Sequence, residues 1–430
     1  MFLKNIKVSN FKNFENISVD LKRFNVLVGA NASGKSNFVS IFGFLKDVVD
    51  SGLDNALSLQ GGIDYIRNIN LGSSQNLSVE LHVDAEDVPV FPIGEKGGKF
   101  LGAFPFEFLH RFSIDFPKKG KKYEITEEII ETDIKLVYFE EENGLVKETG
   151  VSERNKITFT KKNGKIEYDI NEEIERDLEK YAVPYLLTKK IMENGSFKRK
   201  LFLESETPLF FMPIDFQLKN FIRDISLYDF DPKLSRKATQ ITGKTELEPD
   251  GSNLAIVLKN ILEDRKKAEE FSCILRSVLP FIQRVKVQKV IDRSLITNLK
   301  EIYSEDEFLP AFLISDGTIN ITALIIALYF EEKPFVIVEE PERNIHPYLI
   351  SRIVEMMKDV SETMKKRQII ITTHNPEVVK YTDIDHLLFI YRDENGFSRI
   401  SRPSEKEEVK TFLENDVSIE ELYVQNLLEW

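Results

Sequence analysis

The stretch from Asn25 to Phe38 constrains the fold of this chain more than any other. An apolar run, residues 26–28, leads into GANASGKS at 29–36, which has the spacing G-x-x-x-x-G-K-S, and a helical pattern follows. Backbone N–H groups in such a loop point inward at an anion, and the helix N-terminus adds its positive end. The alternative is a glycine-rich turn without a ligand. The complete motif between a strand and a helix favours a nucleoside triphosphate site.

The motif also predicts which side chains bind the nucleotide and its metal ion. We expect ATP and Mg²⁺ as cofactors, with Lys35 reaching the β and γ phosphates in catalysis and the Ser36 hydroxyl binding the metal. No guanine-reading NKxD sequence follows the loop at a plausible place, which disfavours GTP. The other residues that we expect to contact the nucleotide are Gly29, Asn31, Ala32, Ser33, Gly34 and Asn37.

A second apolar run ends in two acids. Residues 335–338 read FVIV, and Glu339-Glu340-Pro341 follow them. Ligands bind at the carboxyl ends of parallel strands, so charge is tolerated there. We expect Glu339 to complete the Mg²⁺ shell and Glu340 to polarise the attacking water. The alternative is an acidic connection between a strand and a helix that has no chemical role.

Two weaker motifs lie in the same third of the chain. The strand-like run 368–373 ends at His374, which can hydrogen-bond a γ phosphate or the lytic water, although an isolated loop histidine needs no such role. Residues 315–318 (SDGT) precede an apolar helix and, taken alone, indicate only a helix N-cap with a tight turn. Strands alternating with helices in this third predict a parallel sheet covered on both faces.

Together these motifs resemble the ABC-type ATPases of the RecF, SMC and OLD group, and in particular their small standalone AAA-family members. The opening IKVSNFKNFENISVDL, the segment LEPDGSNLAIVL and the ending IEELYVQNLLEW are also similar, so the resemblance spans nearly the whole chain. It implies an α/β fold, a P-loop NTPase of the ABC-ATPase type. Its mixed or parallel core sheet would carry a β-rich and a helical insertion between Walker A and the signature motif.

The resemblance also implies roles for single residues. Ser315 and Gly317 would belong to the signature motif, which contacts the γ phosphate held by the opposite subunit of a head-to-tail homodimer. Asn344 would match the D-loop that crosses the same interface, His374 the switch histidine, and Lys12 a basic residue that reaches the nucleotide.

The sequence departs from the family pattern at two positions. Glu339 stands where many relatives have Asp, and Asp316 replaces a glycine of the signature. We therefore expect Mg²⁺-dependent ATP hydrolysis and leave its rate open. The glutamine of the usual Q-loop has no clear counterpart, and Gln60 and Gln217 are both weak candidates.

We expect four segments along the chain. These are an N-terminal ATPase half with Walker A (1–77), a β-rich insertion with basic hairpins that becomes helical near residue 172 (78–205), a helical subdomain (206–300), and a C-terminal ATPase half (301–430). Asn-Gly pairs at 143 and 163 predict hairpin turns. The helical pattern of the third segment runs on to Val285 and places Cys273 in the core.

The insertion decides the subclass. Lys35 and Glu339 lie 304 positions apart, yet the interval holds no long heptad repeat of the kind that an SMC coiled coil requires. Only 56 residues follow His374, too few for the further catalytic domain of an OLD nuclease. No metal-nuclease constellation is present, so nuclease activity would have to come from another chain.

Charge and cysteine content limit the partners. The net charge of −13 means that any nucleic-acid contact must be local. Three basic clusters, at 118–122, 161–165 and 198–200, are either solvated hairpin tips or DNA contacts. The single cysteine fits a reducing cytoplasm, where we expect the protein to act. No apolar run approaches the ~20 residues that a membrane span needs, so we expect no membrane partner.

We therefore expect an ATP-driven dimerising switch. It would act on DNA, or control a separately encoded effector such as a nuclease, in DNA repair or antiviral defence. The alternative is a regulatory or scaffolding ATP-binding subunit without nucleic-acid contact, which the acidic balance supports.

Overall fold

The computed structural model describes residues 1–116, 123–142, 144–162, 165–181, 212–290, 293–364, 367–414 and 417–425. The chain divides into two compact units, which we describe one at a time. The first consists of Met1–Leu21, Asn37–Asp224 and Arg392–Ile400, and the second of Lys22–Ser36, Ile225–Tyr391 and Ser401–Trp430.

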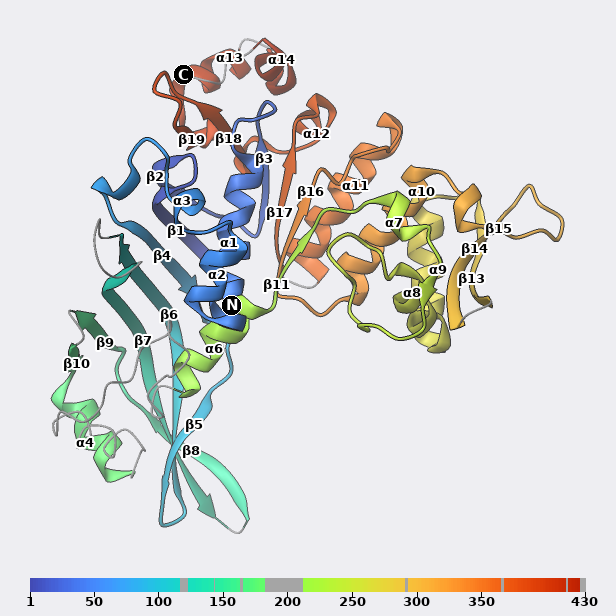
Figure 1. Ribbon diagram of the computed structural model, residues 1–430. Helices are drawn as coiled ribbons and strands as arrows, with labels where there is room; N and C mark the ends of the chain where they lie inside the picture. The colour runs from blue at the N-terminus through green and yellow to red at the C-terminus, as the bar shows by residue number, and fades with distance from the viewer. Residues whose placement is uncertain are drawn as a thin grey trace. The chain divides into compact units, whose positions relative to one another are not determined.

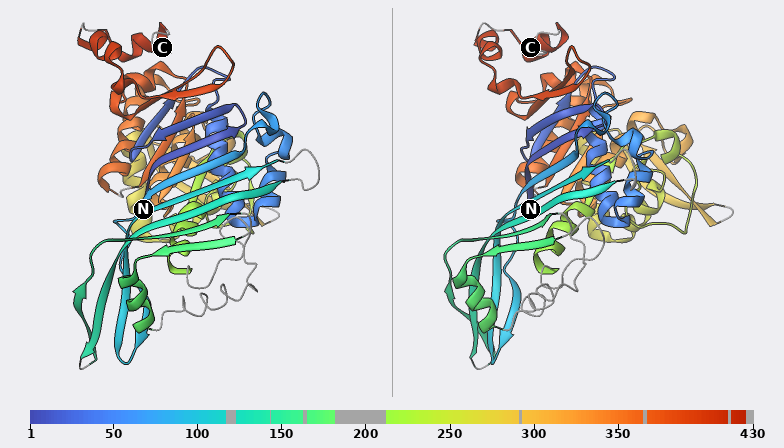
Figure 2. Two further views of the ribbon diagram at one scale, coloured as in Figure 1. Left: turned by 90° about the vertical axis from the view of Figure 1, so that its left-hand side faces the viewer. Right: turned by 60° about the vertical axis from the view of Figure 1, so that its left-hand side comes forward.

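The first unit is built on an antiparallel sheet (Figures 1 and 2). Its strand order is β10-β9-β7-β6-β4-β1-β2, with β5 paired to β6 and β8 to β7. Buried and part-exposed residues alternate along β4, as expected for a strand with one face on a core. Residues 2–9 and 15–21 alternate apolar and polar, which predicts an antiparallel pair of strands, and the pairing of β1 with β2 confirms it. The strands are β1 (Phe2–Phe11), β2 (Phe14–Asp20), β4 (Leu77–Asp84), β5 (Phe91–Lys96), β6 (Lys99–Asp115), β7 (Glu124–Glu142), β8 (Leu145–Val151), β9 (Asn155–Lys162) and β10 (Lys165–Ile170).

The helices of this unit are shorter than the sequence pattern predicts. One helix was expected from Asn37 to Leu59, but Gly52, with a φ of 82°, separates α1 from α2. The helical pattern that begins near residue 172 corresponds to α4. Residues 182–211 lie outside the described part of the chain. The same holds for the predicted basic clusters at 118–122 and 198–200 and for the predicted turn residues 143, 163 and 164. The helices are α1 (Lys35–Ser51), α2 (Leu53–Leu59), α3 (Ile63–Ile66), η1 (Gly72–Ser74), α4 (Glu172–Lys180) and α6 (Met212–Arg223).

The second unit contains the predicted parallel sheet. Its strands β11 (Ile225–Tyr228), β16 (Phe335–Glu339), β17 (Gln368–Thr373), β3 (Phe24–Val28) and β18 (Leu387–Arg392) follow one another in that order, and each neighbouring pair is parallel. Every residue of β3 and β17 is buried. Strands covered on both faces are continuous apolar runs, which is why the sequence pattern identified them. The remaining strand, β19, spans Ser398–Ser401.

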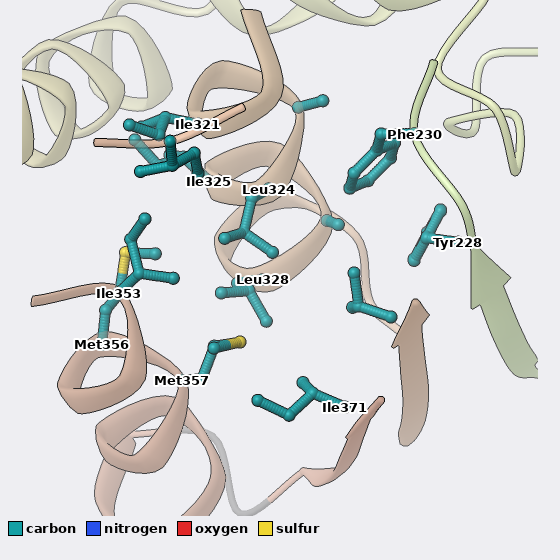
Figure 3. Close-up of a cluster of buried hydrophobic side chains, with 14 of the residues drawn as sticks. Tyr228, Phe230, Ile321, Leu324, Ile325, Leu328, Ile353, Met356, Met357 and Ile371 are labelled. Atoms are coloured by element: carbon teal, nitrogen blue, oxygen red, sulfur yellow. The ribbon is translucent and has the colours of Figure 1, made fainter. Parts of the chain in front are cut away.

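Two helices cover one face of this sheet and form its core (Figure 3). They are α10 (Asp316–Ile325), continued by the π-helical turn η5 (Ile326–Phe330), and α11 (Pro347–Asp359). Figure 3 shows Leu324, Leu328 and Met357 converging toward Ile371 of β17. This apolar layer fixes α10 against the sheet whose strand ends carry the candidate site.

The range 206–300, expected to be helical, also contains strands. Helix α9 (Arg265–Val278) ends before Pro280, and β13 (Ile282–Val290) follows, so the prediction of a helix running to Val285 was wrong. Residues 285–287 read VKV, and this apolar–polar alternation is typical of a strand. The other elements here are α7 (Pro232–Ser235), β12 (Thr239–Gln240), α8 (Leu254–Glu263), β14 (Ser294–Glu301), β15 (Leu309–Pro310) and η4 (Ala311–Leu313), and the sheet order is β12-β14-β13 with β15 on β14.

Cys273 is exposed, which corrects its expected place in the core. Phe271, Leu275 and Val278 occupy the buried face of α9, and Cys273 lies off that stripe. The C-terminal elements are η6 (Val360–Met364), α12 (Pro376–Lys380), η7 (Ile384–His386), η8 (Pro403–Glu405), α13 (Glu407–Glu414) and α14 (Ile419–Val424). Among the helices that the structure describes, none combines the length and apolar character needed to cross a membrane.

Candidate functional site

Three parallel strands of the second unit end at the same edge. Glu339, the last residue of β16, pairs with Thr372, and Thr373 pairs with Val28 at the end of β3. Because the strands are parallel and in this register, the residues that follow each of them meet at one edge. The phosphate-loop motif, the acidic pair and His374 are therefore brought together, although 303 positions separate Ser36 from Glu339 and 34 separate Glu340 from His374.

The loop after β3 turns sharply against β18. A Cβ atom on Gly29 would lie 2.3 Å from the Ile390 carbonyl oxygen and 2.7 Å from the Ser33 Oγ, so only glycine fits. The Ser33 N–H donates to the Ala30 carbonyl over 3.2 Å, and α1 begins at Lys35. Asn31, Ala32 and Ser36 are exposed at the surface of the loop. The loop thus has the compact form that the motif predicts.

Lys35 is held inside the curve of the loop. Its Nζ donates to the carbonyl oxygens of Gly29 and Ala30 over 2.7 and 3.0 Å. Burial lowers the pKa of this ammonium, while the carboxylates of Glu340, Glu342 and Glu339 act in the opposite direction. The nearby acids help to keep the Lys35 ammonium charged. Its position inside the loop is where the motif predicts a phosphate.

Ser36 and Glu339 form a pair of oxygen ligands. The Ser36 Oγ donates to the Glu339 Oε2 over 2.9 Å. Burial raises the pKa of Glu339, and the Ser36 hydrogen bond partly offsets this. Within the described residues, no cluster of three or more acidic, histidine or cysteine side chains gathers to hold a metal. Two hard oxygen donors suit Mg²⁺, which keeps several waters and takes further oxygens from phosphates.

Glu340 is bound by two basic side chains. Its Oε1 lies 2.7 Å from the His374 Nδ1, and its Oε2 accepts from Arg343 Nη2 and Nε over 3.1 and 3.3 Å. Arg343 Nη1 also donates to Asp229, just beyond β11, over 2.9 Å. Burial acts to raise the pKa of Glu340, but the hydrogen bonds from His374 and Arg343 prevail and lower it. The carboxylate is thus kept ionised and oriented at the strand edge.

The signature-like residues begin α10. The Ser315 Oγ accepts from the Thr318 N–H over 3.2 Å and caps the helix, as the sequence predicted. A Cβ atom on Gly317 would lie 2.6 Å from the Asn344 carbonyl oxygen, so α10 approaches the loop after Glu340 closely. Asn320, one turn on, donates to the Arg343 carbonyl over 2.9 Å. The structure therefore links Gly317 to Asn344.

Several of the predicted site residues have a positive backbone φ, which is a strained conformation for residues other than glycine. Six non-glycine residues in the described part of the chain have a positive φ, and Lys12, Ala32, Glu340 and Asn344 are four of them, at 47°, 63°, 44° and 64°. Such conformations are uncommon outside glycine and cluster at functional sites. Strain at Glu340 and Asn344 marks the loop after β16 as a segment held in an unusual shape.

Lys12 and Asn37 lie in the first unit. They line one pocket of about 430 Å³, together with Gln60, Asn13 and Arg67. Burial lowers the pKa of Lys12. Gln60 ends α2 and Gln217 lies within α6, and neither position identifies a Q-loop glutamine.

The parallel sheet and the site at its edge define a P-loop nucleotide-binding protein of the ABC-ATPase type. Residues 24–380 match the family described as "AAA domain, putative AbiEii toxin, Type IV TA system". Since the match covers most of the chain, the protein belongs to this family.

Similar proteins of two kinds were found. A segment of 44 residues is 48% identical to the DNA replication and repair protein RecF of Clostridium acetobutylicum, and it spans 10% of this chain and 12% of that protein. An Smc head bound to the C-winged helix domain of ScpA is 15% identical, with 93% of this chain and 98% of that chain covered and a TM-score of 0.48. The SMC head domain from Thermotoga maritima is 15% identical over 94% of this chain and 99% of that one, with a TM-score of 0.41.

Sequence reasoning missed several residues that hold the site together. Arg343 and Asp229 form an ion pair beside Glu340, but no local pattern places Asp229 near β16, because β11 pairs with β16 across more than 100 residues. Glu342 and Thr373 form a buried pair. Glu342 directly follows Glu339-Glu340-Pro341, and Thr373 ends the strand-like run before His374. The sequence motifs therefore include both positions, but they do not predict that the two side chains are in contact.

Proposed function

We propose that this protein binds and hydrolyses ATP with Mg²⁺, and that hydrolysis occurs at a site completed by a second copy of the chain. The observation that carries the proposal is the meeting of two pairs at one sheet edge, Ser36 with Glu339 and Glu340 with His374. These are the side chains that phosphoryl transfer needs for metal binding and for the attacking water.

The roles follow from the contacts. Phosphate oxygens replace the Gly29 and Ala30 carbonyls that Lys35 now contacts, and the N–H groups of residues 29–37 surround them. Ser36 and Glu339 hold Mg²⁺, which neutralises charge that develops on the phosphates. Glu340 accepts a proton from the attacking water, and His374 orients the carboxylate.

A head-to-tail homodimer explains the surface around α10. Ser315 is exposed, and the two large apolar side chains just before it, Phe312 and Leu313, are 63% and 62% exposed. Exposed apolar side chains beside polar functional residues support a protein contact. In the dimer, Ser315 and Gly317 meet the γ phosphate on the partner, and Asn344 crosses the same interface.

Mixing two inactive variants tests the composite site. Lys35→Ala removes the phosphate-binding ammonium, and Ser315→Arg places a bulky cation at the signature. Each variant alone should lose ATPase activity, whereas Ser315→Arg should still bind ATP. A mixture should regain activity, because one site of the heterodimer has an intact phosphate loop and an intact signature. An inactive mixture, or a fully active Ser315→Arg protein, would contradict the proposal.

We further propose that ATP-driven closure acts on DNA or controls a separately encoded effector such as a nuclease, in DNA repair or antiviral defence in the cytoplasm. The similar segment of a protein named for DNA replication and repair supports DNA, and the family description, which names a toxin, supports an effector system. The prediction is that duplex DNA stimulates the ATPase at low salt and that the effect falls steeply as salt rises.

One observation favours the alternative of a scaffolding subunit without nucleic-acid contact. Basic side chains on the antiparallel sheet pair with acids on neighbouring strands: Lys4 with Asp84 and Glu107, Lys7 with Glu80, and Lys156 with Glu131. Lys162, from one predicted basic cluster, lies 3.6 Å from Glu127. Neutralised lysines attract phosphates weakly, so an ATPase rate that ignores DNA at low salt would favour this function.

A further inference from the structure

Glu342 is a buried acid close to the candidate catalytic residues. It lies two positions after Glu340, and only 7% of it is exposed. Its Oε1 accepts a hydrogen bond from the Thr373 hydroxyl, and Thr373 immediately precedes His374. The carboxyl of Glu342 therefore joins the loop after β16 to the end of β17.

Thr373 is fully buried and binds in two further directions. Its Oγ1 accepts from the Asn375 N–H over 2.9 Å, so the turn that carries His374 is fixed on its far side. Its carbonyl accepts from the Gly29 N–H over 3.3 Å, at the first residue of the phosphate loop. Asn375 caps α12 by accepting from the Glu377 N–H over 2.9 Å. Through Thr373, Glu342 is connected both to the backbone around His374 and to the phosphate loop.

The second oxygen of Glu342 is the unusual feature. Oε2 is buried and has no hydrogen-bond partner among the described residues. Burial raises the pKa of this carboxyl, and the hydrogen bond from Thr373 only partly opposes the shift. A half-satisfied buried acid costs stability, so its presence here calls for an explanation.

We propose that Glu342 is a positioning residue for ATP hydrolysis, and that by holding Thr373 it keeps His374 against Glu340. This inference rests on the proposed function of Glu340 and His374. Glu342 itself contacts neither His374 nor the nucleotide; it acts through the Thr373 hydroxyl. The His374–Glu340 contact of 2.7 Å is the geometry that Glu342 maintains.

Four single variants separate this role from a purely structural one. Glu342→Ala removes the acceptor, and Thr373→Val removes the donor while keeping a similar shape. Both should lower kcat roughly 10-fold to 100-fold, because a small displacement of a catalytic group costs about that much, while the Kd for ATP changes little. Glu342→Gln keeps a carbonyl acceptor and Thr373→Ser keeps a hydroxyl, so both should retain most of the activity.

A double variant and a structure complete the test. Glu342→Ala combined with Thr373→Val should lose no more activity than Thr373→Val alone, since both substitutions break the contact between Glu342 and Thr373, and only Thr373→Val also removes the acceptor of the Asn375 N–H. A crystal structure of Glu342→Ala should show His374 displaced from Glu340, with the contact kept in Glu342→Gln. Unchanged kcat in folded Glu342→Ala, or an undisplaced His374, would overturn the inference. A wild-type protein without ATPase activity would refute the proposed function instead, and the structural comparison would still decide the role of Glu342.

Discussion

The close approach of Gly317 to the loop after Glu340 gives a prediction with a defined magnitude. In Gly317→Ala the added Cβ would lie 2.6 Å from the Asn344 carbonyl oxygen, so the two must separate by about 0.8 Å or more to reach an ordinary contact of at least 3.4 Å. Asn344 has a φ of 64° and cannot yield freely. Overpacking of this kind costs about 1–3 kcal/mol. The same displacement would move Ser315 and Gly317 away from the position that the proposed dimer requires.

Gly317→Ala should therefore be less stable and slower. Urea unfolding should show a loss of about 1–3 kcal/mol, which corresponds to about 2–4 °C in Tm per kcal/mol for a domain of 150–250 residues. We expect kcat to fall roughly 10-fold or more, with ATP binding retained, because the phosphate loop is untouched. Gly150→Ala is the matched control, since its nearest neighbour would be Tyr138 at an ordinary 3.7 Å. A Gly317→Ala protein as stable and as active as the control would refute the reasoning.

Two further predictions concern buried charges away from the site. Burial raises the pKa of Glu331 above its ordinary 4.5, so the stability that this carboxyl contributes is present below that value and is lost as pH rises through the folded pKa. Glu331→Gln does not titrate and still offers an acceptor to the Leu247 N–H. The Tm of this variant should therefore rise relative to that of the wild type as the pH increases above 4.5, and a constant difference would contradict this. Arg367 is 6% exposed and donates to the carbonyls of Leu328 and Glu331 at the end of η5. Arg367→Ala removes the donor to these two carbonyls and should lower the free energy of unfolding in urea by roughly 3 kcal/mol. A loss below about 1 kcal/mol would contradict the role of Arg367 as the donor at the end of η5.

The strands that carry the site were predictable because each is buried on both faces. Continuous apolar runs identified β3, β16 and β17, and the polar residues that follow them identified the phosphate loop, Glu339, Glu340 and His374. What local patterns do not encode is which strands become neighbours. The placement of β17 between β3 and β16, and the pairing of β11 with β16, depend on packing across the whole unit. Asp229, Arg343 and the contact between Glu342 and Thr373 were missed for this reason.

Errors within single elements have a different cause. The helix expected to run to Val285 follows an apolar pattern that fits a helix and a strand alike, and the break before Pro280 decides between them. Cys273 was placed in the core because its neighbours are apolar, although the buried stripe of α9 passes beside it. The signature, by contrast, was readable only through its resemblance to a family, since SDGT alone indicates no more than the helix cap that Ser315 forms.

The central claim is that ATP binding closes a dimer across the signature. The most direct measurement is the mass of Glu340→Gln in solution, by light scattering, with and without saturating ATP and Mg²⁺. This variant should bind ATP without hydrolysing it, and its mass should rise from the 49.8 kDa of one chain to about twice that value. The double variant Glu340→Gln, Ser315→Arg should remain at the mass of one chain. A Glu340→Gln protein that binds ATP and yet stays monomeric would contradict the account.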